Sequence, residues 1–186
     1  VKARAPALLR HPQALKPLGF ATDPGRVELT VRTREGETRT ATLEAQPPFR
    51  GEWMRVPPGH GRALPAWVAR QGDPYWFEVR PREKLLYFQF NAVQDRRGGE
   101  TLAAFAERLA RAIDGDDVRH VVVDLRGNGG GNTDLLGPLL KAILATRKTQ
   151  REDGLFVIAG RHTFSAAMNF AAQLERHGRA VFVGEP

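Results

Sequence analysis

The chain has 186 residues, of which 41% are hydrophobic, and this allows one domain or one domain with a small appendage. No apolar stretch approaches the roughly 20 residues that a membrane-spanning helix needs, and the lack of cysteine excludes disulfides and thiolate chemistry. The formal net charge is +7, but the 28 lysine and arginine residues are scattered without a basic run, so they do not predict nucleic-acid binding.

Residues 1–46 predict a small, β-rich accessory region. Prolines at three positions limit any helix there to a short one around Ala14. Residues 27–33 and 38–43 alternate between apolar and polar side chains, and Glu35-Gly36 lies between them. This pattern predicts a β-hairpin that turns at the glycine.

Residues 47–83 predict a linker followed by an aromatic segment. Paired prolines and several glycines between residues 47 and 65 indicate an irregular connection. Residues 75–79 could form either a strand edge or an aromatic surface patch. We expect Trp76 to pack, because large aromatic side chains mostly lie in cores.

Residues 84–186 predict an α/β core. Strands are expected at residues 85–90, 120–125, 155–159 and 180–183, and helices after Thr101, at 134–145 and at 165–176. Thr101 is a helix cap, and five apolar residues of its helix fall on one face: Leu102, Phe105, Ala106, Leu109 and Ile113. Alternating strands and helices with short connections predict a layered fold with largely parallel strands.

The ends of the chain suggest a piece of a longer protein. The sequence opens at Val1 without methionine and stops at Gly184-Glu185-Pro186, where the core is expected to be incomplete. We therefore expect a fragment, in which missing targeting signals carry little meaning.

Residues 121–132 join a strand to a helix through three consecutive glycines. Glycine lets the backbone adopt dihedral angles closed to other residues and approach another group closely. Free N–H groups before a helix suit negative charge, but no Gly-Lys-Ser/Thr follows, so the turn is not a P-loop. The remaining interpretation is an oxyanion hole, and Ser165, which begins the next helix, is the candidate nucleophile.

Two stretches carry a family resemblance. The first, Asp124-Leu125-Arg126-Gly127-Asn128-Gly129-Gly130-Gly131, resembles the DLRxNGGG motif of the C-terminal processing (tail-specific) and tricorn-type serine peptidases. The second, Thr163-Phe164-Ser165-Ala166-Ala167, resembles their nucleophile motif, and residues 177–186 are similar to the strand that follows it. The resemblance covers roughly residues 85–186.

This resemblance implies a crotonase-like (ClpP/crotonase) core and peptide hydrolysis through an acyl-enzyme at Ser165. The oxyanion donors would be backbone N–H groups of Gly129 or Gly130 and of Ala166. Many members also carry a PDZ domain that holds substrate C-termini. The hairpin and Leu18-Gly19-Phe20 resemble parts of one, although a plain hairpin is the preferred interpretation.

Other residues near the motifs have structural interpretations. Asp124 and Arg126 are expected to fix the turn through hydrogen bonds and an ion pair, and Asn128 to orient it. Asn132 or Asp134 is expected to cap the following helix.

The sequence does not identify the general base. In Ser/Lys members the lysine follows the serine at a distance that would fall beyond Pro186. Two further positions depart from that subtype, because Arg176 stands where those members often have an acid and Met168 where they have a glutamate. These departures favour a histidine base, as in tricorn-like peptidases, or an inactive relative.

Five histidines are candidates for that base. His60 lies in a Pro/Gly-rich segment that could fold over the site, and His162 is closest to Ser165 in sequence. His11 is a weaker candidate, while His120 and His177 have structural explanations at the ends of elements. No cluster has metal-ligand spacing, so we expect no metal or other cofactor.

Two alternatives to a peptidase stay open. The same scaffold can carry hydrophobic ligands without catalysis, as the repeats of interphotoreceptor retinoid-binding protein do, and acyl-CoA chemistry on a crotonase-like core is a third interpretation. The peptidase interpretation implies a protein or peptide substrate. Family habit favours an extracytoplasmic location.

Overall fold

The computed structural model describes residues 15–44 and 64–184 and divides the chain into two units, Val1–Pro57 and Pro58–Pro186. Among the described helices, none has the length and apolar character to cross a bilayer. The helix expected around Ala14 lies outside the described residues.

The first unit contains the predicted hairpin, which is confirmed. Strands β1 (Arg26–Arg32) and β2 (Thr38–Glu44) pair antiparallel. The turn between them includes Gly36 at a φ of 88°, a value that glycine adopts without a steric penalty. The N–H groups of Gly19 and Phe20 donate to Lys16 O and Leu15 O, so these donors are not free for a carboxylate.

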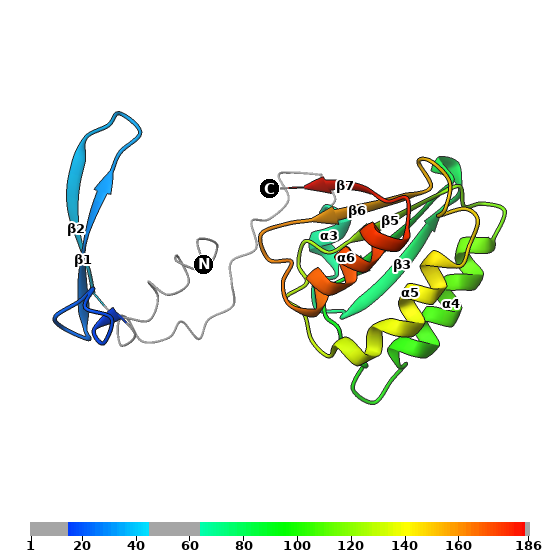
Figure 1. Ribbon diagram of the computed structural model, residues 1–186, viewed down its shortest axis with the longest axis horizontal. Helices are drawn as coiled ribbons and strands as arrows, with labels where there is room; N and C mark the ends of the chain where they lie inside the picture. Colours follow the sequence, from blue (N-terminus) through cyan, green and yellow to red (C-terminus); the bar gives the residue numbers. More distant parts are fainter. Residues whose placement is uncertain (1–14, 45–63, 185–186) are drawn as a thin grey trace. The chain divides into compact units, whose positions relative to one another are not determined.

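The second unit is a five-stranded sheet in the order β3-β4-β5-β6-β7. Strands β4 to β7 are parallel, and β3 pairs antiparallel with β4 at one edge (Figure 1). The elements in chain order are α3 (Ala66–Ala69), β3 (Tyr75–Arg80), a 3₁₀ turn (Pro81–Glu83), β4 (Leu85–Phe90), α4 (Leu102–Asp114), β5 (His120–Asp124), a second 3₁₀ turn (Thr133–Leu135), α5 (Leu136–Leu144), β6 (Leu155–Ala159), α6 (Ala166–His177) and β7 (Val181–Gly184).

Alternation along the strands separates the two faces of this sheet. Helices α4, α5 and α6 cover one face of the sheet (Figure 1). The fully buried strand side chains that pack in the core with these helices are Leu86, Phe88, Phe90, Val121, Val123, Leu155 and Val157. All five apolar residues predicted on one face of α4 are buried with them, and Thr101 Oγ1 accepts the Ala104 N–H at 3.2 Å. The prediction of an α/β core with largely parallel strands is therefore confirmed, while its crotonase-like assignment stays a prediction.

The opposite face of the sheet carries buried polar groups. It bears Tyr87, Gln89 and Asp124, and Gln89 Nε2 donates to the carbonyl of Trp67 in α3 at 2.8 Å. The aromatic segment forms β3, so it is an edge strand, and Trp76 packs with only 4% of its surface exposed. The sheet thus starts inside residues 47–83, and the three-part domain division stays a prediction.

Candidate active site

The turn that follows β5 is held by the segment that follows β4. Val93 N–H donates to Gly130 O at 2.9 Å, and Asn132 N–H donates to Val93 O at 2.8 Å. Inside the turn, the buried Asn128 accepts the Gly130 N–H on Oδ1 at 2.8 Å. Asn128 therefore orients the turn, as predicted from the sequence.

Two of the three glycines are required by close approach. A Cβ on Gly131 would lie 2.1 Å from Val93 O, and one on Gly130 would lie 2.7 Å from Ser165 Cβ. Both residues also have positive φ, +107° at Gly130 and +143° at Gly131, which L side chains rarely adopt. Gly129 has open space where its Cβ would be. The glycines at 130 and 131 thus let the turn touch both of its neighbours.

The predicted nucleophile segment docks directly on this turn. Thr163 Oγ1 donates to Leu125 O at 2.8 Å, and Phe164 N–H donates to Asn128 O at 3.0 Å. These bonds join the loop after β6 to the loop after β5, which are neighbouring parallel strands. The two sequence motifs therefore form one structural unit at the carboxyl edge of the sheet.

Ser165 occupies a backbone conformation unusual for a residue other than glycine. Its φ is 54° and its ψ is −125°, and the side chain is exposed at the N-terminus of α6. Strained dihedrals of this kind persist where the surroundings enforce them, and they present a nucleophile at a sharp strand-to-helix turn. The side chain makes no capping hydrogen bond, and within the described residues its Oγ has no partner. Helix capping therefore does not explain this serine.

Backbone donors surround the same point. A Cβ on Gly130 would lie 3.1 Å from Ala166 N, so the turn and the first residue of α6 are adjacent. The Gly130 N–H is already bonded to Asn128, whereas the N–H groups of Gly129 and Ala166 have no acceptor in the described part of the chain. The N-terminus of a 12-residue helix adds a partial positive charge at this place. The arrangement can stabilise an anion.

A partly buried ion pair, with Asp124 buried and Arg126 about one third exposed, lies at the start of the turn. Arg126 donates to Asp124 through Nε and Nη2, the shortest contact being 2.6 Å, and Tyr87 Oη donates to Asp124 Oδ2 at 2.6 Å. Arg126 Cζ also lies 4.8 Å from the centroid of the Trp67 ring. These contacts agree with the role expected for Asp124 and Arg126, which is to fix the turn through hydrogen bonds and an ion pair.

The same contacts shift two proton affinities. Burial, and then the hydrogen bond to the Asp124 carboxylate, raise the pKa of the Tyr87 phenol well above its ordinary range. The hydrogen bond to Asp124 raises the pKa of the Arg126 guanidinium. Both groups therefore stay protonated near neutral pH. The cluster of Tyr87, Asp124 and Arg126 thus has a structural role and does not act as a general acid or base.

None of the described histidines forms a hydrogen bond with Ser165. His162 is exposed in the loop before Ser165 and has no hydrogen bond to it. His120 Nδ1 lies 2.7 Å from Asp153 O at the start of β5, the edge opposite the glycine turn. His177 ends α6, which places it about 18 Å from Ser165 at the usual rise per residue.

The other base candidates are not placed by the structure. His11 and His60 lie outside the described residues. The two departures from the Ser/Lys pattern, Met168 and Arg176, are both exposed on α6. Within residues 15–44 and 64–184 no group of three or more histidine, aspartate or glutamate side chains could hold a metal ion.

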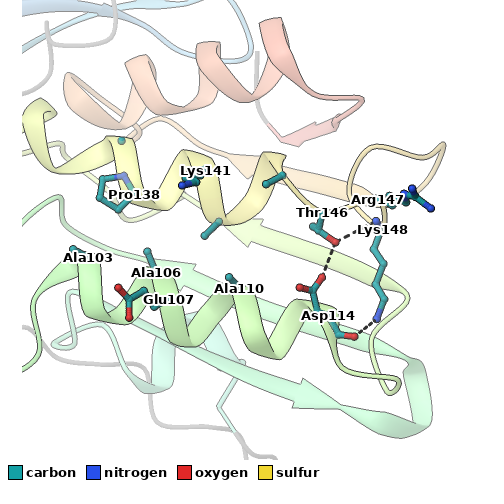
Figure 2. A pocket seen from close by; sticks show the side chains of 13 residues that line it. Ala103, Ala106, Glu107, Ala110, Asp114, Pro138, Lys141, Thr146, Arg147 and Lys148 are labelled. Atoms are coloured by element: carbon teal, nitrogen blue, oxygen red, sulfur yellow. Dashed lines mark hydrogen bonds between the residues drawn. The ribbon is translucent and has the colours of Figure 1, made fainter.

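A separate groove of about 800 Å³ lies between α4 and α5 (Figure 2). Ala103, Ala106 and Ala110 line it from one helix, and Lys141 and Pro138 from the other (Figure 2). At one end, Lys148 Nζ donates to Asp114 O and Gly115 O at 3.0 and 2.6 Å. No residue of the two motifs lines this groove, so it is distinct from the candidate site.

The structure also shows contacts that sequence analysis missed. The contacts around the turn come from β4, from the segment just after it and from α3, and involve Tyr87, Gln89, Asn91, Val93 and Trp67. The sequence gives one signal for these contacts, which is the presence of polar residues within and just after the apolar strand at residues 85–90. Of the two cap candidates, Asn132 is the cap, because its Oδ1 accepts the Asp134 N–H at 3.0 Å.

Comparison with known proteins gives one family. The sequence model of peptidase family S41 matches residues 84–186, which is more than half of the chain. No curated protein matches the chain.

Several solved structures are similar to the chain. The photosystem II D1 C-terminal processing protease is 20% identical over 86% of this chain and 43% of its own, with a TM-score of 0.43. Mature CPAF complexed with lactacystin is 12% identical over 86% and 53%, with a TM-score of 0.44. A lipoprotein from Streptococcus agalactiae is 12% identical over 59% and 48%, with a TM-score of 0.44. The chain thus spans about half the length of these proteins.

Proposed function

Because the chain belongs to peptidase family S41, we propose that it carries the nucleophile and the oxyanion hole of a serine endopeptidase. One observation carries the proposal. Ser165 is exposed and uncapped at a φ of 54°, and the glycine turn lies directly against it. A serine that merely began a helix would use its hydroxyl as a cap and would not need this strained backbone.

The chemistry follows from this arrangement. A general base takes the proton of the Ser165 hydroxyl as Oγ attacks the peptide carbonyl. A C–O bond forms, and the carbonyl π electrons move to the carbonyl oxygen. The Gly129 and Ala166 N–H groups donate to that oxygen, and the partial positive charge at the N-terminus of α6 further stabilises its negative charge. We favour Gly129 over Gly130 as the donor because the Gly130 N–H already bonds Asn128 at 2.8 Å. Removing one such donor typically costs about 10²–10³ in rate.

Collapse of the tetrahedral intermediate breaks the C–N bond and leaves an acyl-enzyme at Ser165. The departing amine takes a proton from the base, and the base then activates the water that hydrolyses the ester. We propose that this base comes from outside the described residues. His60 is the candidate within this chain, and a lysine or histidine of a longer parent protein is the other.

A non-catalytic module that binds peptides or hydrophobic ligands is the second candidate function. One observation favours it: no described side chain bonds Ser165 Oγ. Such a module would keep the turn and the helix but would lack a base in the folded full-length protein.

Cleavage by the full-length protein separates the two candidates. We would follow degradation of an unfolded protein substrate by mass spectrometry, with Ser165→Ala and His60→Ala as variants. The peptidase predicts cleavage that Ser165→Ala abolishes while the thermal unfolding curve is unchanged. Cleavage that survives Ser165→Ala would exclude Ser165 as the nucleophile. No cleavage by either folded protein would favour the binding module.

A further inference from the structure

Asn91 joins the end of β4 to the segment that precedes β3. Its Nδ2 donates to Asp73 O at 2.7 Å and to Arg70 O at 3.2 Å, and its Oδ1 accepts from Gln89 Nε2 at 2.9 Å. Its backbone N–H donates to Pro74 O at 2.7 Å. The side-chain amide thus uses both donor hydrogens and its acceptor, which fixes its orientation.

The glycine turn lies on the other side of Asn91. Two residues further along the chain, Val93 exchanges backbone hydrogen bonds with Gly130 and Asn132. Asn91 Oδ1 would lie 3.4 Å from a Cβ added to Gly127, so the amide lies beside the start of the turn. Asn91 therefore lies between residues 70–74, which it bonds, and the glycine turn.

Gln89 also links Asn91 to helix α3, which contacts the turn. Its Nε2 donates both to Asn91 Oδ1 and to the Trp67 carbonyl, and the Trp67 ring lies over Arg126. Gln89 is only 2% exposed, and it lies beside Asp124 in the register of β4 and β5. Gln89 Oε1 is buried without a hydrogen-bond partner among the described residues, so the support comes from Nε2, whose loss would leave the Asn91 Oδ1 acceptor unpaired.

From these contacts we infer that Asn91 is a positioning residue for the oxyanion hole. Asn91 holds the start of the Asn91–Val93 segment against residues 70–74. Val93, at the end of that segment, fixes the position of the glycine turn through its hydrogen bond to Gly130 O. A shift of the turn would therefore move the Gly129 N–H that we propose as an oxyanion donor. The inference rests on the proposed function, and it assigns no substrate contact to Asn91.

A positioning role of this kind acts on the transition state more than on substrate binding. Displacing an oxyanion donor by a fraction of an ångström weakens its bond to the tetrahedral oxygen but leaves ground-state contacts in place. Asn91→Ala in the full-length protein should therefore lower kcat by about 10- to 100-fold and leave KM nearly unchanged.

Two ligands separate positioning from loss of structure. A peptide aldehyde forms a tetrahedral adduct with Ser165 and needs the oxyanion hole, whereas the matching product peptide does not. In Asn91→Ala, the affinity for the aldehyde should fall by the same factor as kcat, and the affinity for the product peptide should stay within about twofold. Asp73→Ala is the matched control, because it removes only the exposed ion pair with Arg70 and keeps the Asp73 carbonyl that Asn91 bonds.

The outcomes are distinct. If the wild-type protein cleaves substrate and Asn91→Ala matches Asp73→Ala in kcat and aldehyde affinity, the inference is wrong and the proposed function stands. Equal losses of aldehyde and product-peptide affinity would also overturn it. If Asn91→Ala does not fold, Gln89→Met removes the same amide support with little change in volume and should show the same selective loss. A wild-type protein that neither cleaves nor binds the aldehyde would overturn both the proposed function and this inference.

Discussion

Gly130 lies so close to Ser165 that any side chain on the glycine would collide with the serine. A Cβ there would be 2.7 Å from Ser165 Cβ and 2.8 Å from Phe164 O. Neighbouring backbone cannot yield easily, because Phe164 N–H is bonded to Asn128 O at 3.0 Å. The glycine motif and the serine motif are therefore two halves of one packed contact.

Gly130→Ala should lower kcat/KM for peptide cleavage by at least about 10²-fold. The alanine must push the turn away from Ser165 and adopt a φ of +107°, which L residues disfavour. Steady-state cleavage of a peptide substrate measures the loss.

Gly137→Ala is the matched control for that change. Its Cβ would meet nothing within 4 Å, and Gly137 lies in α5, outside both motifs. Activity should stay within about threefold of wild type, since neither a clash nor a lost hydrogen bond is introduced. Equal losses in the two variants would contradict the steric account.

Asn128→Ala should lower both stability and activity. It removes the acceptor of the Gly130 N–H inside the protein, which typically costs about 1–3 kcal/mol, and it frees the turn to move. Urea unfolding and kcat measure the two effects. Asn132→Ala is the comparison, because it removes a cap on the Asp134 N–H and should cost about 1 kcal/mol without changing kcat. An Asn128→Ala protein with full activity would show that the amide does not hold the turn.

Tyr87→Phe should lower the free energy of unfolding near neutral pH. It should also make that free energy fall less as the pH becomes alkaline. The lost hydrogen bond to a carboxylate is worth about 1.5–3 kcal/mol. Because the pKa of Tyr87 is raised in the folded state, the stability due to its neutral phenol is present below the ordinary phenol pKa of about 10 and is lost as pH rises above that value.

Urea unfolding near neutral pH and above about pH 10 tests this prediction. The wild type should lose more stability over that interval than Tyr87→Phe does. Tyr75→Phe is a useful comparison, since burial also raises the pKa of Tyr75 but its hydroxyl donates to a backbone carbonyl, that of Glu100. An identical alkaline loss in wild type and Tyr87→Phe would contradict the assignment.

Arg126→Lys should destabilise the protein although the charge is kept. Lysine cannot form the two-nitrogen contact with Asp124 or stack on Trp67, and Asp124 is only 1% exposed. We expect a loss of about 1–3 kcal/mol in the free energy of unfolding. Arg82→Lys, at an exposed position, should change it by less than about 0.5 kcal/mol.

Much of the second unit could be predicted from the sequence, because its strands and helices have strong local patterns. The β-run at residues 85–90, the capped amphipathic helix α4 and the buried strand β5 all lie where these patterns place them. The two motifs were expected to form one site, and their neighbouring strands bring them together. Each of these features depends on residues close in sequence.

The support of the turn could not be predicted, because it depends on residues far apart in the chain. Asn91 bonds Arg70 and Asp73, and Tyr87 bonds Asp124, across separations that no periodicity encodes. The sequence also left Gly129 and Gly130 equivalent as donors. Only the bond from Gly130 N–H to Asn128 distinguishes them. The general base stays a prediction for the same reason, since its position relative to Ser165 depends on tertiary structure.

The most direct test of the central claim is covalent labelling of the nucleophile. The full-length protein would be treated with a fluorophosphonate, digested and mapped by mass spectrometry. A single adduct is expected on Ser165, absent from Ser165→Ala and strongly reduced in Gly130→Ala. A folded protein that carries no adduct, or carries it on another residue while Ser165 stays unmodified, would contradict the account.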